Sequence, residues 1–151
     1  MKRYPGLVLI ALSGLILAAC SGTNASTPTV STSSAGEVSG AGLTQTKEEA
    51  SVTVKATPLN LNDASAATLD FQIALDTHSV DLAYDMLSIV TLRSNTGEEV
   101  QPTKWDGPAG GGHHVSGTLS FPQLTDRGQS VTLILHGIAG VPERTFEWEV
   151  K

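Results

Sequence analysis

The sequence has one cysteine, few aromatic residues and few charges, and each scarcity excludes a class of protein. Its single cysteine, Cys20, cannot form an intramolecular disulfide. Only 16% of the 151 residues are charged, and 15 acidic residues outnumber 9 basic ones, which gives a net charge of −6. An acidic chain without runs of Lys or Arg is not expected to bind nucleic acid. With 5% aromatic residues, an aromatic platform for carbohydrates is also disfavoured.

Several motifs of familiar active sites and metal sites are also missing. A blue-copper centre needs a cysteine ligand, and a methionine-rich copper carrier needs more than Met86, which is the only methionine after the first residue. The sequence contains neither H-x-H nor H-E-x-x-H, and it has no G-x-S-x-G elbow of a serine hydrolase. We therefore expect no catalytic residues and no enzymatic activity.

The first twenty residues have a positive start and a short apolar run. Lys2 and Arg3 precede residues 6–19, a run of about 14 residues that is too short to span ~30 Å of hydrocarbon comfortably. The run ends in LAAC (Leu17–Cys20), which resembles the lipobox of bacterial lipoprotein precursors. The resemblance implies cleavage of a signal peptide, residues 1–20, just before Cys20, and acylation of the Cys20 sulfur. The alternatives are an ordinary secretory signal and a membrane anchor.

Lipidation would make a membrane the first partner of the chain, because each buried methylene of an acyl chain contributes ~0.8 kcal/mol. We expect a location in the cell envelope, either on the outer face of the cytoplasmic membrane or on the outer membrane.

Residues 21–50 are predicted to form a flexible linker. Up to residue 46 this stretch consists mostly of Ser, Thr, Gly and Ala, with one charge at Glu37, and it cannot bury enough apolar surface to offset the entropy of ordering.

Residues 51–151 are predicted to form an all-β domain. Apolar residues alternate with polar ones in several short segments, which is typical of strands with one buried face. In this pattern Trp148 alternates with Phe146 and Val150, which places it in the core. The seven predicted strands are residues 52–56, 69–75, 88–93, 98–103, 118–121, 131–136 and 146–150. This spacing predicts an antiparallel immunoglobulin-like β-sandwich without a disulfide.

The predicted strands place all four histidines at one end of the sandwich. If each strand reverses the direction of the last, every second connection lies at the same end. These connections are residues 77–86, 104–114 and 137–142. His78, His113 and His114 lie within them, and His136 closes the strand before the third.

Two hypotheses account for the histidines at this end. Neutral imidazole is a ligand of Zn and Cu, and Asp76 and Asp81 could accept the N–H groups of ligating rings. Because neighbouring strand residues point to opposite faces, only one of His113 and His114 readily joins such a site. In the alternative, the histidines are structural and hydrogen-bond to the backbone of the loops.

Trp105 is the other residue with a candidate role in binding. Exposed, its ring could stack on a ligand; buried, it would close the end of the sandwich, and the low aromatic content favours burial.

Several blocks of sequence look like a group of uncharacterised bacterial envelope domains, a resemblance that covers most of residues 51–151 and implies no activity. These blocks are residues 77–82, 105–108, 112–117 and 119–122.

The sequence as a whole favours a lipid-anchored, extracytoplasmic binding or structural module whose ligand it does not identify. Another protein of the envelope is the expected kind of partner. The alternative function is a metal-binding accessory protein that holds Zn or Cu through the histidines at one end of the sandwich.

Overall fold

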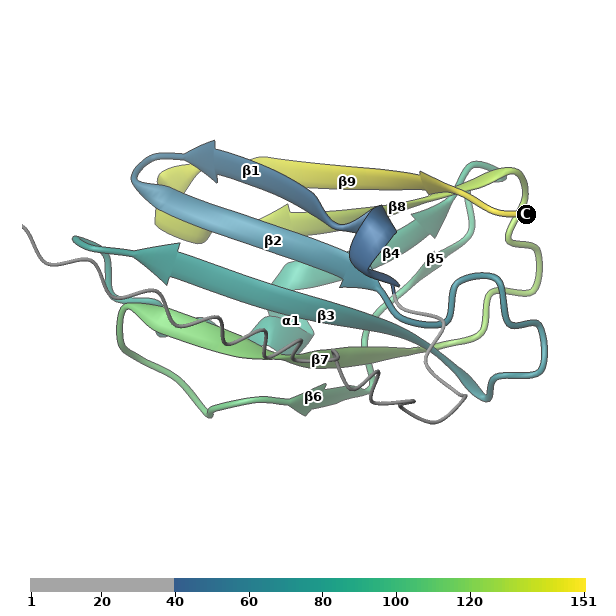
Figure 1. Ribbon diagram of the computed structural model, residues 1–151, viewed down its shortest axis with the longest axis horizontal. Helices are drawn as coiled ribbons and strands as arrows, with labels where there is room; N and C mark the ends of the chain where they lie inside the picture. Colours follow the sequence, from purple (N-terminus) through teal and green to yellow (C-terminus); the bar gives the residue numbers. More distant parts are fainter. Residues whose placement is uncertain (1–39) are drawn as a thin grey trace, which may run out of the picture. The chain divides into compact units, whose positions relative to one another are not determined.

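The computed structural model describes residues 40–151, which are almost entirely β-structure (Figure 1). Nine strands form two antiparallel sheets, one ordered β1-β2-β3-β7-β6 and the other β5-β4-β8-β9. The strands are β1 (Gln45–Glu49), β2 (Val52–Pro58), β3 (Thr68–Thr77), β4 (Val90–Ser94), β5 (Glu99–Val100), β6 (Lys104–Asp106), β7 (His114–Pro122), β8 (Ser130–His136) and β9 (Glu143–Glu149). Three short helical turns complete the fold: η1 (Gly40–Leu43), α1 (Met86–Ile89) and η2 (Ile138–Gly140). Within these residues, no helix is long and apolar enough to cross a membrane.

The strand order is that of an immunoglobulin-like sandwich, as the sequence predicted. The run β2-β3-β7-β6 corresponds to the A-B-E-D sheet of an immunoglobulin domain, and β4-β8-β9 corresponds to its C-F-G sheet. The described residues contain no cysteine, so the sheets are joined by packing and hydrogen bonds alone.

The predicted strand 98–103 is in fact two strands that belong to different sheets. Glu99–Val100 pairs with β4 in the four-stranded sheet, whereas Lys104–Asp106 pairs with β7 in the five-stranded sheet. Pro102 lies between them, and its lack of an N–H group interrupts pairing at this point. The chain therefore crosses from one sheet to the other where the sequence suggested a strand end or an edge.

The linker predicted up to residue 50 is too long, because residues 45–49 form β1. This strand pairs with β2 through a turn at Ala50 and Ser51, both of which have the positive φ values of a tight hairpin (48° and 62°). The segment also reaches the other sheet, since the indole N–H of Trp148 donates to the carbonyl of Leu43 at 2.6 Å. Residues 45–49 show no apolar alternation, because none of their side chains is buried in the core.

The core lies between the two sheets and includes three phenylalanines and Trp148. Phe71 makes an edge-to-face contact with Phe121, with ring centroids 5.7 Å apart, and a tilted contact with Trp148 at 5.5 Å. Trp148 stacks on Phe146 and is 4% exposed, which confirms the prediction that it belongs to the core. Such aromatic pairs add to the area that they bury.

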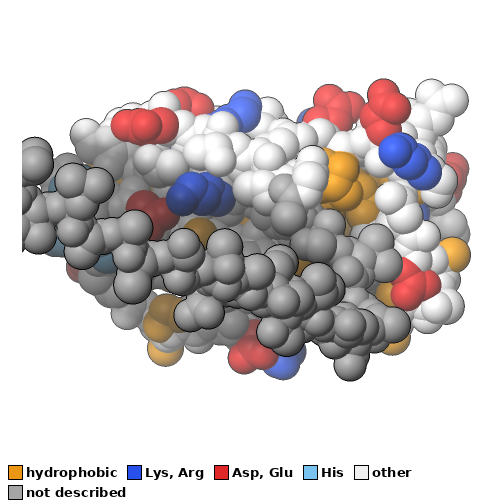
Figure 2. Space-filling view, viewed as in Figure 1, with side chains coloured by type: hydrophobic (Ala, Val, Ile, Leu, Met, Phe, Trp, Pro, Cys, Tyr) orange, Lys and Arg blue, Asp and Glu red, His pale blue; other side chains and the backbone are white. Residues whose placement is uncertain are grey.

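Charged side chains lie mostly on the surface. Figure 2 shows acidic and basic groups scattered over one face, with polar groups between them. Several form exposed ion pairs, such as Arg93 with Glu99 at 3.5 Å and Lys55 with Asp76 at 3.7 Å. Pairs of this kind contribute only about 0–1 kcal/mol each to stability.

Candidate functional site

Three connections and one turn meet at one end of the sandwich, which we call the loop pole. It comprises residues 50–51, 78–89, 107–113 and 137–142. In Figure 1 the strand ends that define it, where β3 and β8 end and β7 and β9 begin, lie toward the left, and α1 lies nearer the middle. The four histidines all belong to this end, because they lie in these connections or at the adjoining strand ends. The sequence-based placement of the histidines therefore agrees with the structure, despite the split strand.

Arg144 is the buried residue that ties the loop pole together. It lies on β9 and pairs with Leu135 of β8, so its side chain enters the space between the sheets, where it is 1% exposed. Nη1 of its guanidinium donates to the carbonyl of Ile138 at 2.7 Å, and Nη2 donates to the carbonyl of Glu49 at 2.8 Å, whereas the buried Nε has no hydrogen-bond partner among the described residues. Within residues 40–151, no carboxylate lies at ion-pair distance from this group, so the backbone carbonyls solvate its charge.

Further hydrogen bonds join the connections of the loop pole to one another. The amide of Ala139 donates to the hydroxyl of Tyr84 at 2.8 Å. This hydrogen bond joins the connection that precedes β4 to the connection that follows β8. The amide of Leu82 donates to the carbonyl of Gly112 at 3.1 Å, and the amide of Gly112 donates to Oδ1 of Asp81 at 3.0 Å. These loops are therefore tied by specific contacts.

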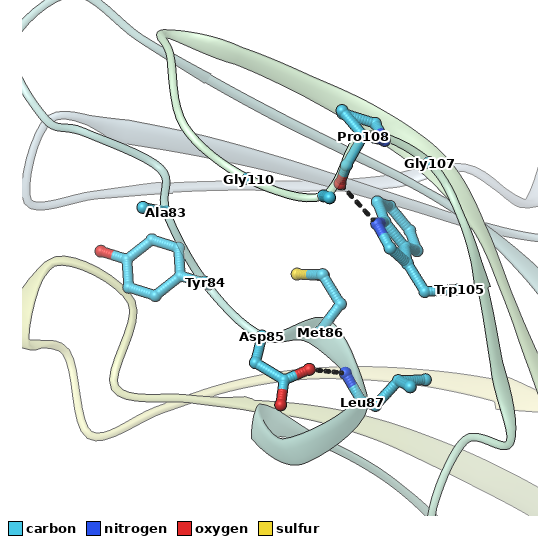
Figure 3. A pocket seen from close by; sticks show the side chains of 10 residues that line it. Ala83, Tyr84, Asp85, Met86, Leu87, Trp105, Gly107, Pro108 and Gly110 are labelled. Carbon is cyan, nitrogen blue, oxygen red and sulfur yellow. Dashed lines mark hydrogen bonds between the residues drawn. The ribbon is translucent and has the colours of Figure 1, made fainter.

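A groove of about 560 Å³ opens at the loop pole between the segment 83–87 and the segment 105–110 (Figure 3). Its lining is mostly apolar: Met86 and Leu87 come from α1, and Trp105 and Pro108 come from the opposite segment. Its volume lies in the range of about 300–1,000 Å³ that is common for small-molecule sites. Leu87 is 39% exposed, which is unusual for a large apolar side chain in this domain.

Trp105 forms one wall of the groove and is held in a fixed position. Its indole N–H donates to the carbonyl of Pro108 at 2.9 Å (Figure 3). A Cβ atom at Gly107 or at Gly117 would collide with the ring, so both glycines make room for it. Trp105 is half-buried, so neither predicted alternative, an exposed ring or a buried ring, describes it fully. Part of the ring packs on the domain and part faces the groove.

The structure brings two of the four histidines together. The rings of His78 and His114 lie 6.5 Å apart between centroids, nearly perpendicular to each other, and Nδ1 of His114 is 2.8 Å from Oδ1 of Asp76. His136 lies on the other sheet, with Nδ1 3.7 Å from the carboxylate of Glu143. His113 lies next to His114 and is exposed, and its carbonyl accepts the amide N–H of Thr77.

The structural alternative gains no support, because the side chains of His78, His113 and His114 are exposed and, among residues 40–151, no histidine ring hydrogen-bonds to the backbone of the loops. The buried side chain that does bond to backbone carbonyls at this end is Arg144. Nor does Asp81 serve a histidine ring, since its carboxylate accepts the amide N–H of Gly112.

Asp76 remains a carboxylate partner of a histidine. The hydrogen bond from His114 is the main cause that lowers the pKa of Asp76 below its ordinary value, and the positive charge of Lys55 adds to it. Groups of three or more His, Cys, Asp or Glu side chains that could hold a metal ion do not occur within residues 40–151. Cys20, the predicted lipidation site, lies outside the described residues.

No family model, curated protein or solved structure matches this chain. The functional assignment therefore depends on the geometry of the loop pole.

Sequence reasoning missed two important residues of the loop pole, Arg144 and Tyr84. Arg144 could have been found by extending the alternation of Phe146 and Trp148 back by two positions, which places an arginine on the inward face of the strand.

The contacts of Arg144 predict a loss of stability when its hydrogen bonds are removed. We expect Arg144→Met, which keeps an unbranched side chain, to lower the free energy of unfolding by ~1–3 kcal/mol, because the buried carbonyl of Ile138 and the part-buried carbonyl of Glu49 lose their donor. Urea denaturation measures this loss. The matched control is Arg93→Met, which breaks only an exposed ion pair and should change stability by less than about 1 kcal/mol. Equal effects of the two substitutions would show that Arg144 does not tie the loop pole.

Proposed function

We propose that this protein is a lipid-anchored, extracytoplasmic binding module that holds its ligand in the groove of the loop pole. The observation that carries the proposal is the groove itself, an open groove with a partly apolar lining and a positioned tryptophan, at an end of the sandwich where such folds commonly bind ligands. Because hydrogen bonds already join the surrounding loops, little ordering is required when a ligand enters.

The lining of the groove suggests the chemistry of the ligand. The N–H of Trp105 is already bonded to Pro108, so the ring offers its apolar surface and not a donor. Leu87 and Pro108 extend this apolar surface, and Met86, which is 2% exposed, lies beneath it. Asp85 is exposed at the edge of the groove, where its carboxylate caps α1 by accepting the amide N–H of Leu87. We therefore propose a small ligand with an aromatic or other flat apolar body and a positively charged end.

The anchoring part of the proposal is supported by the LAAC motif at Leu17–Cys20. Acylation of Cys20 would hold the module at a membrane of the envelope, and residues between Cys20 and the domain would form the tether. In this arrangement the domain samples ligands outside the cytoplasm, on the outer face of the cytoplasmic membrane or on the outer membrane.

The two tryptophans allow a direct test of the groove. Tryptamine and indole serve as probes, because the first combines the proposed flat body with a positive charge and the second lacks the charge. In ¹H–¹⁵N NMR spectra of the full chain in detergent, we expect tryptamine to shift the indole N–H signal of Trp105 and to leave that of buried Trp148 unchanged. Indole should bind more weakly, because it makes no contact with Asp85.

Matched variants identify the groove as the origin of these shifts. Leu87→Lys places a positive charge in the groove, where it repels a cationic ligand, whereas Leu59→Lys places one at a similarly exposed leucine away from it (39% and 40% exposed). The first variant should abolish the shift of Trp105 and the second should retain it. If a series of aromatic amines leaves the Trp105 signal unmoved in the unmodified chain, the groove is not a site for this class of ligand.

The anchoring proposal has its own test. Cys20→Ala removes the sulfur that acylation requires, so the variant should accumulate as a longer, unprocessed precursor or appear in the wrong compartment. Labelling with a radioactive fatty acid, followed by electrophoresis, should mark the unmodified protein and not the variant. Efficient processing and membrane retention of Cys20→Ala would refute lipidation at this residue.

A further inference from the structure

Beyond the groove, we propose that His78 and His114 form a surface site for a divalent transition-metal ion, with Cu(II) bound more tightly than Zn(II). Asp76 positions His114 within this site. The proposal concerns two of the four histidines and a different face of the loop pole, so it does not depend on what the groove binds.

The three residues share one face of the five-stranded sheet at its end. Asp76 lies directly opposite His114 in the pairing of β3 with β7. Thr77, the last residue of β3, is buried, and the residues on either side of it, Asp76 and His78, therefore face outward together. The strand pairing thus places two imidazoles and one carboxylate on neighbouring strands at a single corner of the outer surface.

Asp76 prepares His114 for metal binding. Its Oδ1 lies 2.8 Å from Nδ1 of His114, so the carboxylate holds the tautomer whose Nδ1 carries the proton and whose Nε2 has a free lone pair. The second carboxylate oxygen faces Lys55 at 3.7 Å. Carboxylate partners of this kind orient ligating histidines and make them more basic, and the 69% exposed side chain of His114 leaves its other nitrogen accessible.

The distance between the rings is close to that needed to share an ion. Metal–nitrogen bonds of ~2.1 Å bring the centroids of two rings on one ion to roughly 5 Å, whereas His78 and His114 are 6.5 Å apart. Because the side chain of His78 is exposed, rotation about its own bonds can close this difference. Water completes the coordination, so this site needs only two protein ligands. Imidazole ligands of this kind bind Cu(II) more tightly than Zn(II).

Calorimetric titration of the full chain in detergent, purified without a polyhistidine tag, tests the site. We expect one Cu(II) ion to bind and Zn(II) to bind more weakly. His78→Ala and His114→Ala should each lower the affinity at least tenfold, and Asp76→Asn should lower it about 10–100-fold, as is usual for partners of ligating histidines. The matched control is His136→Ala, which removes a histidine of the loop pole on the other sheet and should change nothing.

Two further measurements separate a loss of metal binding from a loss of folding, and this site from the groove. Melting curves without metal should coincide for the three histidine variants, because none of these side chains is buried, and all variants retain Cys20, so any binding by its sulfur is common to them. Leu87→Lys, which repels a cationic ligand from the groove, should leave Cu(II) binding intact and so separates this site from the proposed function. Absence of Cu(II) binding by the unmodified chain would overturn the proposal, as would an equal loss of affinity in His136→Ala and His114→Ala.

Discussion

The architecture of the loop pole depends on the buried guanidinium of Arg144. A charge that is removed from water needs acceptors, and in this domain the carbonyls of Ile138 and Glu49 supply them. One carbonyl belongs to the turn that follows β8, and the other belongs to the end of β1 in the opposite sheet. The arginine therefore joins two sheets that have no disulfide between them, and movement of either acceptor would remove one of the two hydrogen bonds of its buried charge.

This constraint links packing to function. The turn that Arg144 holds also contains Ala139, whose amide bonds to Tyr84 at the rim of the groove. The connection that contains Tyr84 also contains His78, and it is bonded in turn, through Leu82 and Gly112, to the segment that precedes His114. The groove and the proposed metal site thus lie on loops that the fold positions before any ligand arrives, which reduces the entropic cost of binding.

Much of the fold was predictable from the sequence, because one buried face imposes alternation on every central strand. The same alternation, together with strand direction, located the four histidines at one end. The edge strands were not predictable. Strand β1 has no apolar alternation, and the crossing at Pro102 depends on the sheets with which β5 and β6, on either side of it, pair. The site was predictable only in part, since contacts such as that of Tyr84 with Ala139 join residues 55 positions apart and depend on the packed loops.

We conclude that the loop pole is ordered by its own hydrogen bonds before a ligand binds. Amide hydrogen exchange in the ligand-free protein, followed residue by residue by NMR, measures this order most directly. We expect the amides of Ala139, Leu82 and Gly112 to exchange slowly, with protection approaching that of the central strands, because each donates to a specific acceptor. Exchange of these three amides at the rates of an unstructured peptide would show that the loop pole is not ordered before binding.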